Sequence, residues 1–317
     1  MITRQLNLFT APRQPLVVAY GVGVDSTAVL VEFVRRGIRP DLILHADVGA
    51  EKPETVQYIP VMNAYLAAHG FPTVTVVRYV PKKFKHWPPY YTLEQNCLTN
   101  GTLPSISFNF RFKSCSQKWK AAPQHAYLKA WRPAVERWAS GGKVKKVIGY
   151  DAGVKDKKRV TYACNAEMHA DLYEYWYPLP EWGWDRERCM AEIAAAGLPV
   201  PPKSSCFMCA AMHPEEVEAL GLDQLRRIVR LEARARPRFK SINGLWGAGS
   251  KNRSGSMTEY IRAKGLLPAA EIDAIITQTP QEILDYQECF QRGESVEPFG
   301  AFIEQQLIQI EGMPLAA

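Results

Sequence analysis

The sequence contains no long apolar segment, no internal repeat and no low-complexity tract. Its 317 residues are 47% apolar and 22% charged, the composition of an ordinary globular protein with a large core and one or two domains. No apolar run reaches the length of a membrane span, and residues 1–5 have no signal-peptide pattern. We therefore expect a cytoplasmic protein without a membrane partner.

Cysteines are present, but only one close pair occurs. Seven cysteines without a secretion signal favour a reducing compartment, and metal or thiol chemistry rather than disulfides. The pair is Cys206-x-x-Cys209, whereas a zinc ribbon normally carries two such pairs. By itself the pair could hold a metal ion or act as a redox dithiol.

Two common phosphate-binding motifs, the Walker A loop and the full Gly-x-Gly-x-x-Gly pattern, are also missing. Instead, residues 16–19 predict a buried strand, Gly21-Val22-Gly23 a turn, and residues 26–36 a helix that ends at Gly37. A strand, a glycine turn and a helix start bind phosphate well, because free backbone N–H groups and the helix dipole attract anions. The glycines let the backbone approach a phosphate closely.

Short β-rich runs alternate with helical segments in the N-terminal part of the chain. Further strands are expected at residues 41–46, 73–80, 145–150 and 173–179. This alternation predicts the α/β class, with a doubly wound, mostly parallel sheet that binds ligands at the carboxyl ends of its strands. A helix should begin at Pro53 and kink or restart at Pro60. Asp185 is expected to cap a later helix.

The C-terminal part of the chain is predicted to be helical. The segments with helical spacing are 214–220, 223–235, 257–264, 268–278, 280–292 and 298–310. Residues 240–256 are rich in glycine, serine and cations and are expected to form a mobile loop that could close over a substrate. We expect an N-terminal arm (1–14), a nucleotide-binding α/β domain with the cysteines (15–210) and a helical C-terminal region (211–317).

The glycine turn resembles the pyrophosphate loop (PP-loop) of the ATP pyrophosphatases, written Ser-Gly-Gly-x-Asp-Ser. Gly23, Asp25 and Ser26 match this pattern, while Gly21 and Val22 stand at its first Ser and Gly. Residues 46–55, Ala-Asp-Val-Gly-Ala-Glu-Lys-Pro-Glu-Thr, resemble a stretch of the phosphoadenosine phosphosulfate (PAPS) reductase family, a branch of the PP-loop proteins. An ordinary strand-to-helix turn is the alternative for each stretch.

Three later stretches resemble the same family, in its order. Residues 115–123 are similar to its Cys-Thr-x-x-x-Lys-x-x-Pro pattern, with Cys115 and Lys120 matching. Gly149 matches the glycine after a core strand, and Arg159 stands, at an unusual spacing, where the family has an arginine that meets the anionic substrate. Residues 189–209 resemble a helix with one cysteine followed by Lys-Ser-x-Cys-x-x-Cys.

The resemblance implies an adenine nucleotide alpha hydrolase-like (PP-loop) fold that binds ATP with Mg²⁺. The cofactor-binding residues that it implies are Tyr20, Gly21, Gly23, Asp25, Ser26, Thr27, Asp47, Gly49 and Gly149. The catalytic residues that it implies are Asp25, Ser26, Lys120 and Arg159. In such enzymes a substrate oxygen attacks the α-phosphate, which gives an adenylylated intermediate and pyrophosphate.

The resemblance also implies a metal site of four dispersed cysteines. These are Cys115, Cys189, Cys206 and Cys209. Four thiolates suit a 4Fe-4S cluster or Zn²⁺, and the dispersed pattern resembles the cluster-bearing members of the family, which ranks iron–sulfur above zinc. Cys97, Cys164 and Cys289 are interpreted as structural.

The implied function is ATP-dependent adenylylation and sulfur transfer to a nucleic acid, similar to DNA phosphorothioation or tRNA thiolation. A cysteine desulfurase or another sulfur donor would be a partner. A sulfonucleotide reductase is one alternative, although Glu288-Cys289-Phe290 lacks the Gly that follows Cys in the family's C-terminal motif. A nucleic-acid-binding module with a degenerate nucleotide loop is another alternative.

The charge of the chain favours an anionic partner. The net charge is +7 and the pI is near 9.0, which suits a nucleotide or a nucleic acid, DNA or tRNA. Cations and aromatics are interleaved at 82–91, a cationic loop is expected at 155–159, and six arginines lie within residues 226–238. These segments could form one basic surface, but each is also typical of an ordinary solvated face.

Overall fold

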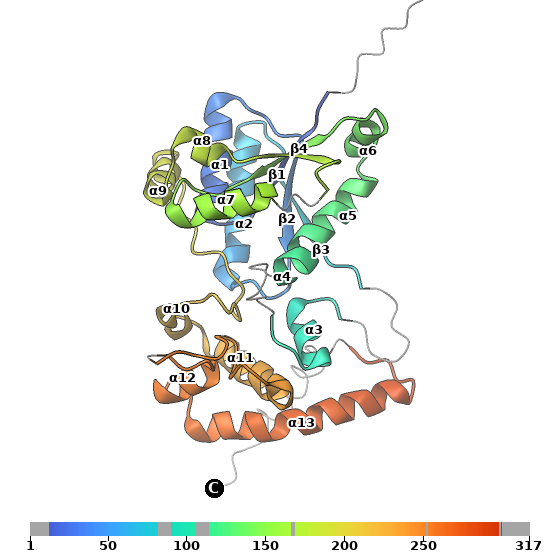
Figure 1. The fold of residues 1–317 in the computed structure, drawn as a ribbon, viewed down its shortest axis with the longest axis vertical. Coiled ribbons are helices and arrows are strands. Elements are labelled where there is room, and N and C mark those ends of the chain that lie inside the picture. Colours follow the sequence, from blue (N-terminus) through green and yellow to red (C-terminus); the bar gives the residue numbers. More distant parts are fainter. Residues whose placement is uncertain are drawn as a thin grey trace, which may run out of the picture. The chain divides into compact units, whose positions relative to one another are not determined.

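The chain forms two compact units that interleave along the sequence (Figure 1). The computed structural model describes residues 13–81, 90–104, 114–165, 169–251, 253–297 and 299. Unit 1 comprises Met1–Ala46, Pro53–Val77 and Pro123–Ser204. Unit 2 comprises Asp47–Lys52, Arg78–Ala122 and Ser205–Ala317.

Unit 1 is built on a five-stranded, all-parallel sheet with the strand order β3-β2-β1-β4-β5. The strands are β1 (Leu16–Ala19), β2 (Leu42–Asp47), β3 (Val74–Arg78), β4 (Val144–Ile148) and β5 (Tyr173–Trp176). In the register, Val18 of β1 lies opposite Ile43 of β2 and Val147 of β4. The strand order reverses between β1 and β4, and open α/β sheets bind their ligands at such a switch point. The predicted α/β class and parallel sheet are confirmed.

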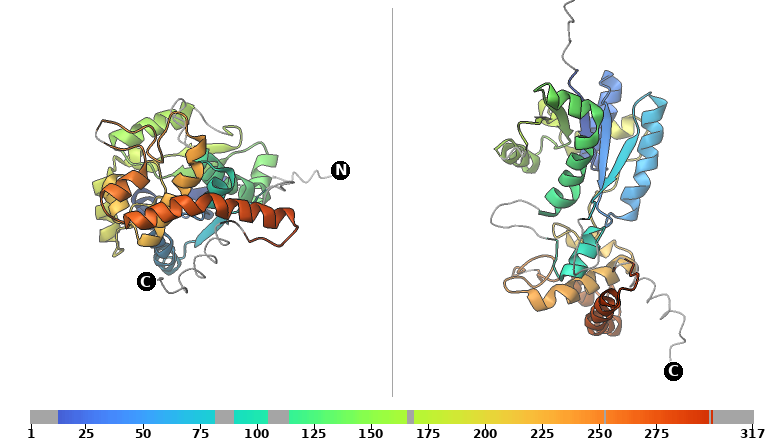
Figure 2. Two further views of the ribbon diagram at one scale, coloured as in Figure 1. Left: turned by 90° about the horizontal axis from the view of Figure 1, so that it is seen from below. Right: turned by 90° about the vertical axis from the view of Figure 1, so that its right-hand side faces the viewer.

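Helices cover both faces of this sheet because successive strand residues point to opposite sides. Val18 packs with α1 (Val24–Arg36), α2 (Pro53–Ala68) and α9 (Arg186–Ala195). Val17 packs on the other side, with α5 (Ala122–Ala130) and α6 (Arg132–Ala139). The right-hand view of Figure 2 shows α2 (light blue) and α5 (green) on opposite sides of the sheet.

Two details of unit 1 differ from the sequence-based expectation. The expected strand 173–179 ends at Trp176, because Pro178 opens the short helix α8 (Pro178–Trp182). The expected cationic loop at 155–159 lies instead in α7 (Val154–Asn165). The Asp151 side chain accepts a hydrogen bond from Gly153 N just before this helix, and Asp156 lies in its first turn, where the helix dipole favours an acidic residue.

Both helices that contain an internal proline are continuous. The helix does not restart at Pro60, and this part of the prediction is wrong. Helix α2 runs through Pro60, with Tyr58 and Met62 buried beside it. Two helices were expected around Pro280, but α13 (Ala269–Gln291) is one. The buried Thr279, just before Pro280, donates its hydroxyl to Ile275 O at 2.6 Å within this helix.

Unit 2 is mainly helical, in agreement with the expectation for the C-terminal region. Its elements are α3 (Leu93–Asn100), α4 (Ser114–Ser116), the π-helix η1 (Gln117–Ala121), α10 (Pro214–Glu218), α11 (Leu222–Ala235), the 3₁₀ turn η2 (Arg236–Arg238), α12 (Met257–Ala263) and α13. The apolar face of α11 includes Leu225, Ile228 and Leu231, which are buried in the same core as Ile272 of α13 and Ile261 of α12.

A buried carboxylate, Glu232 of α11, holds the segment 240–256 that was expected to be a mobile loop. Glu232 is 4% exposed. Its oxygens accept hydrogen bonds from Leu245 N (2.7 Å), Met257 N (2.9 Å), Thr258 N (2.9 Å) and the Ser256 hydroxyl. The loop is therefore tied to the core of unit 2, and the same carboxylate satisfies free N–H groups at the start of α12.

Some expectations fall on residues outside the described ones. These are most of the N-terminal arm, most of segment 82–91 and the helix expected at 298–310. Within the described ranges, no helix is both long and apolar enough to cross a membrane.

Replacing Glu232 by Ala should lower the stability of the protein by about 3 kcal/mol or more, because several buried donors lose their acceptor together. Glu215→Ala, at an exposed position of α10, is the matched control and should change the stability by less than about 0.5 kcal/mol. Thermal and denaturant unfolding of both variants measure the effect. Equal stability of the two variants would show that Glu232 does not anchor the loop.

Candidate functional site

The glycine turn after β1 has a strained backbone. Val22 has a φ angle of 55° and is fully buried, although β-branched residues rarely adopt a positive φ. Such a conformation costs about 1 to 2 kcal/mol, and strained residues of this kind cluster at functional sites. The PP-loop pattern has Gly at this position, where a positive φ carries no such penalty.

Hydrogen bonds from the start of α1 hold this turn. Ser26 Oγ donates to Gly23 O and accepts from Gly21 N, each at 3.2 Å. Tyr20 Oη and Thr27 Oγ1 lie 3.1 Å apart. The structure therefore brings together the predicted residues Tyr20, Gly21, Gly23, Ser26 and Thr27 in one loop. Ser26 is 7% exposed, and its buried hydroxyl holds the backbone of the loop at Gly21 and Gly23.

No side chain caps the N-terminus of α1. Gly23 caps this helix without any side-chain hydrogen bond, and the first helical N–H groups lie at the mouth of the loop. Helix α1 begins at Val24, two residues earlier than expected. Asp25 and Ser26 therefore lie in its first turn, where backbone N–H groups can hold phosphate oxygens.

Two glycines allow other segments to approach this turn closely. A Cβ atom at Gly149, just after β4, would lie 2.7 Å from Ser26 N. A Cβ atom at Gly23 would lie 2.7 Å from Ser204 Oγ. The predicted site residue Gly149 thus packs directly against the first turn of α1, at the switch point of the sheet.

Three aspartates gather beside the loop. Asp25, Asp151 and Asp156 each offer a carboxylate oxygen, and these oxygens all lie within 4.8 Å of one another. They come from α1, from the loop after β4 and from the first turn of α7. Two arginines face this triad: Arg186 Nη1 lies 3.3 Å from Asp25, and Arg159 Nη1 lies 2.8 Å from Asp156.

Without a bound cation, burial and mutual repulsion disfavour the ionised forms of Asp25 and Asp156. The pKa of Asp25 is raised to about 6, mainly by burial, with Arg186 opposing the rise and the Asp151 and Asp156 charges adding to it. Burial is also the main cause of the raised pKa of Asp156. Oxygens around Mg²⁺ lie about 3.0 Å (cis) to 4.2 Å (trans) apart, because the metal–oxygen distance is about 2.1 Å. Carboxylate oxygens are the ligands that hard divalent cations prefer, and the 4.8 Å limit is wider than this range, so oxygens at that limit would have to move closer together to share one Mg²⁺ ion.

The sequence-based reasoning missed Asp156, Arg186 and Ser204 as parts of this site. Asp156 precedes Arg159 by three residues, a spacing that brings two side chains together only on a helix. Because segment 155–159 is expected to be a loop from its sequence, the spacing does not predict a contact between Asp156 and Arg159. Nothing in the sequence indicates Arg186 or Ser204, which approach the loop only through the fold.

The predicted residues Asp47 and Gly49 lie in unit 2 and shape a turn. Asp47 accepts a hydrogen bond from Gly49 N (2.7 Å) and pairs with Arg78 (2.8 Å). Gly49 has a φ of 68°, and a Cβ atom there would lie 2.3 Å from Thr92 Cγ2. The conformation and the close contact both require glycine.

Lys120, predicted to be catalytic, lies on the π-helix η1 of unit 2. Its neighbour Lys118 is fixed by Tyr90 Oη and Asn96 Oδ1, each at 2.9 Å. Lys120 Nζ lies 3.2 Å from Glu51, whose side chain is 2% exposed. Burial alone would lower the pKa of Lys120, but Glu51 and then the Cys206 thiol outweigh it and raise the pKa above its usual value. One-turn π-helices often occur at functional sites, because they re-aim a side chain.

Three of the four predicted metal-binding cysteines belong to unit 2. Cys206 pairs with Glu51 in an isolated antiparallel bridge, and a tight turn brings Cys209 N to within 3.1 Å of Cys206 O. The pKa of Cys206 is raised, first by burial and then by Glu51, while Lys120 opposes this and Cys209 and Cys115 add to it. Cys115, Cys206, Cys209 and Lys120 therefore share one electrostatic environment.

Cys189 belongs to unit 1, so neither unit by itself holds all four cysteines. It is fully buried in the core formed by α1 and α9, and burial raises the pKa of its thiol to about 12. Among the described residues, the aspartate triad is the only group of three or more His, Cys, Asp or Glu ligand atoms within 4.8 Å of one another. Four sulfurs around Zn²⁺ would lie about 3.8 Å apart, and the sulfurs of Cys115, Cys206 and Cys209 in unit 2 do not all lie within 4.8 Å of one another.

The arginines of α11 do not form the expected basic surface, because they are engaged within unit 2. Arg226 pairs with Glu271, Arg227 with Glu94 and Arg230 with Glu282, and Arg234 donates to Leu98 O. Arg236 and Arg238, which follow in η2, are exposed.

Replacing Asp25 by Asn should stabilise the metal-free protein at pH 8 by about 2 kcal/mol and abolish Mg²⁺ binding. The pKa of Asp25 in the folded protein (about 6) exceeds its ordinary value of 3.8. Its ionisation therefore costs stability fully above pH 6, and the cost disappears as the pH falls towards 4. Unfolding midpoints in EDTA at pH 8 and pH 4.5 measure the gain, which should be present only at pH 8.

Asp171→Asn, an exposed position of unit 1, provides the control and should show no such gain. A loss of stability in Asp25→Asn at pH 8 would mean that Asp25 has a structural role.

No known family model matches this chain, and no curated protein matches it either. The functional conclusion therefore depends on the geometry of the two units.

Proposed function

We propose that unit 1 binds ATP with Mg²⁺ and transfers the adenylyl group to an acceptor, with release of pyrophosphate. One observation carries this proposal: the uncapped N-terminus of α1 and its strained glycine loop lie beside three clustered aspartates at the switch point of the sheet. The first feature suits phosphate oxygens, and the second suits the divalent ion that accompanies a triphosphate.

The residues of the loop would act mainly by position and charge. The backbone N–H groups of the first turn of α1 would hold phosphate oxygens. Mg²⁺ on the triad would neutralise charge that develops on the pyrophosphate. Arg159 and Arg186, which pair with Asp156 and Asp25, would be free to meet the nucleotide if these carboxylates held a metal ion. An acceptor oxygen attacks the α-phosphorus, the bond to pyrophosphate breaks, and preorganised donors stabilise the leaving group.

For the later steps we propose sulfur transfer to a nucleic acid, with a 4Fe-4S cluster on Cys115, Cys206, Cys209 and Cys189. The shared electrostatic environment of three of these thiols with Lys120 supports the cluster. A cysteine desulfurase or another sulfur donor would supply the sulfur, and DNA or tRNA would be the acceptor.

Ser26→Ala should lower Mg²⁺-dependent pyrophosphate release from ATP by about 10- to 100-fold, because the loop loses the hydroxyl that holds Gly21 and Gly23. Gly149→Ala should abolish the release, since its Cβ atom would displace the first turn of α1. Ser140→Ala, on the exposed end of α6, is the control and should keep full activity. The assay uses candidate nucleic acids as acceptors, and circular dichroism checks the fold.

Pyrophosphate release that is unchanged in Ser26→Ala and in Asp25→Asn would rule out the glycine loop as the nucleotide site.

Anaerobically purified protein should be brown, with visible absorption that bleaches on reduction. Alanine at Cys115, Cys189, Cys206 or Cys209 should lower the iron content. Cys97→Ala should not, because Cys97 is 1% exposed in the core of unit 2 and burial raises its thiol pKa to about 12. Metal analysis of the five variants provides the measurement. Stoichiometric zinc without iron would show that the cysteines bind the other metal.

A further inference from the structure

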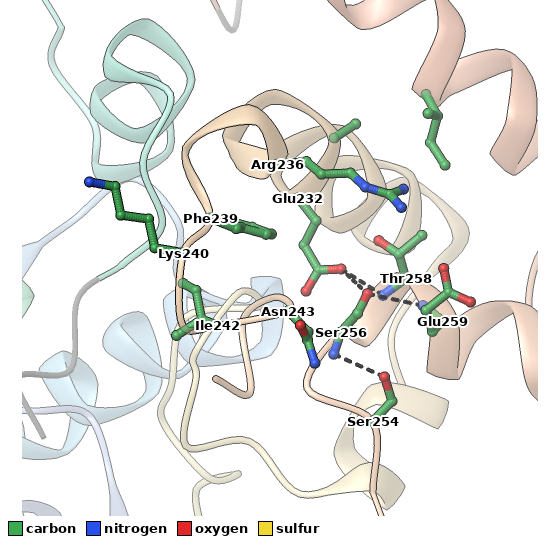
Figure 3. Close-up of a pocket in the computed structure, with 12 residues that line it drawn as sticks. Glu232, Arg236, Phe239, Lys240, Ile242, Asn243, Ser254, Ser256, Thr258 and Glu259 are labelled. Carbon is green, nitrogen blue, oxygen red and sulfur yellow. Dashed lines mark hydrogen bonds between the residues drawn. The ribbon is translucent and has the colours of Figure 1, made fainter. Parts of the chain in front are cut away.

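Unit 2 contains a pocket of about 520 Å³ that the proposed function does not use. It lies between the end of α11, η2, the loop 240–256 and the start of α12. Figure 3 shows the side chains that line it, among them Glu232, Arg236, Phe239, Lys240, Asn243 and Thr258. Its volume is within the range of sites that bind small organic ligands.

The floor of this pocket is rigid and already satisfied. Glu232 uses both carboxylate oxygens for the four hydrogen bonds to the loop and to α12. Asn243 is fixed as well, since its side-chain amide donates to Ala248 O at 3.0 Å. The amide oxygen of Asn243 remains as an acceptor on the pocket wall.

One polar group on the wall has no partner. The residue Thr258 is 5% exposed, and its hydroxyl Oγ1 is buried without a hydrogen-bond partner among the described residues. Buried hydroxyls are nearly always hydrogen-bonded, so an unpaired one calls for an explanation. Because Thr258 lines the pocket, a polar atom of a ligand in the pocket would provide the missing partner.

The lining of the pocket has two cations, Arg236 and Lys240, beside two carboxylates, Glu232 and Glu259. Further cations follow in the same stretch of the chain. Arg236, Arg238, Lys240, Lys251 and Arg253 are exposed, and none forms an ion pair with another described residue. This contrasts with the arginines of α11 that pair with Glu271, Glu94 and Glu282. An uncompensated group of cations in one segment attracts an anion with several charges.

We propose that this pocket binds one nucleotide of a single-stranded nucleic acid. Arg236 would hold its phosphate, and Lys240, whose side chain extends the other way (Figure 3), would hold the phosphate of an adjacent nucleotide. The ring of Phe239 would stack on the base, and Thr258 and Asn243 would hydrogen-bond its edge. The remaining cations, Arg238, Lys251 and Arg253, lie outside the lining and suit the neighbouring phosphates of a strand. For this reason a strand fits better than a free mononucleotide.

The proposal is independent of ATP binding, because the pocket and the glycine loop belong to different units. It is tested by fluorescence anisotropy of labelled 12-nucleotide DNA and RNA strands with the full-length protein over a series of salt concentrations. Phe239→Ala should weaken binding by about 5- to 150-fold, the loss expected for one stacked base. Pyrophosphate release without nucleic acid should not change.

The role of the cations in strand binding is tested by removing two of them. The double variant Arg236→Gln, Lys240→Gln should weaken binding and lower the slope of log K against log salt by about 1.4, because two phosphates lose their partners. Lys129→Gln with Lys143→Gln removes the same charge from exposed positions of unit 1. This control should leave affinity and slope nearly unchanged.

Thr258→Val separates a ligand-binding role from a structural one. The two side chains have nearly the same shape, so the variant removes only the unpaired hydroxyl and should be as stable as the original protein or more so. Strand binding should nevertheless weaken several-fold.

Three results would overturn the proposal. The first is strand binding that is unchanged in Phe239→Ala and in Arg236→Gln, Lys240→Gln. The second is the absence of binding to either strand at low salt. The third is a free mononucleotide that binds as tightly as the strand and depends equally on Phe239, which would assign the pocket to a small molecule.

Discussion

The site in unit 1 depends on the close approach of the end of β4 to the first turn of α1. Gly149 permits this approach, since any side chain there would meet the backbone of Ser26. The approach brings the loop after β4 to the mouth of the glycine turn, and Asp151 and Asp156 follow in that loop and in α7. Without it, Asp25 would have no acidic neighbours, and the helix N-terminus would attract anions without any means to hold a metal ion. A single backbone contact thus joins the two halves of the proposed ATP site.

Two features of this site lower the folding stability of unit 1. Val22 is held at a positive φ angle, and three carboxylates are brought within 4.8 Å of one another. Neither feature stabilises the metal-free protein, and burial makes the ionised form of Asp25 less favourable still. The rest of unit 1 compensates through packing on both faces of its sheet. Two neighbouring features that both cost folding stability are more easily explained by a bound ligand than by a role in folding.

The sequence predicts the parts of the fold that are governed by local pattern. The strands, the Gly37 helix end and the Asp185 cap follow from periodicity and capping chemistry, and all are present. The errors arise where tertiary contacts outweigh local preference. Pro60 and Pro280 do not end their helices because buried neighbours keep the chain helical. Segment 155–159 is helical because Asp156, in the first turn, suits the positive end of the helix dipole, which a count of cations does not reveal.

The candidate site divides in the same way. Gly21, Gly23, Asp25 and Ser26 are consecutive or nearly so, and a motif can therefore indicate them. Arg186 and Ser204 come from distant segments and enter only through the packing of α9 and of the chain beyond it. The anchor role of Glu232 is equally hidden, since an acidic residue in an amphipathic helix is expected to face solvent, whereas this one is buried by the loop that it holds.

For nucleic-acid binding, the position and pairing of each cation matter more than the net charge of the chain. A net charge of +7 and an arginine-rich helix predict a basic surface, yet most arginines of α11 are neutralised by Glu94, Glu271 and Glu282. Neutralised cations release no counterions to a nucleic acid and add little to its affinity. The cations that can contribute are those without carboxylate partners, and among the described residues of unit 2 five of them, Arg236, Arg238, Lys240, Lys251 and Arg253, lie in η2 and in the loop that Glu232 anchors. The buried carboxylate therefore does more than stabilise the core, because it fixes in place the segment that carries the free positive charge.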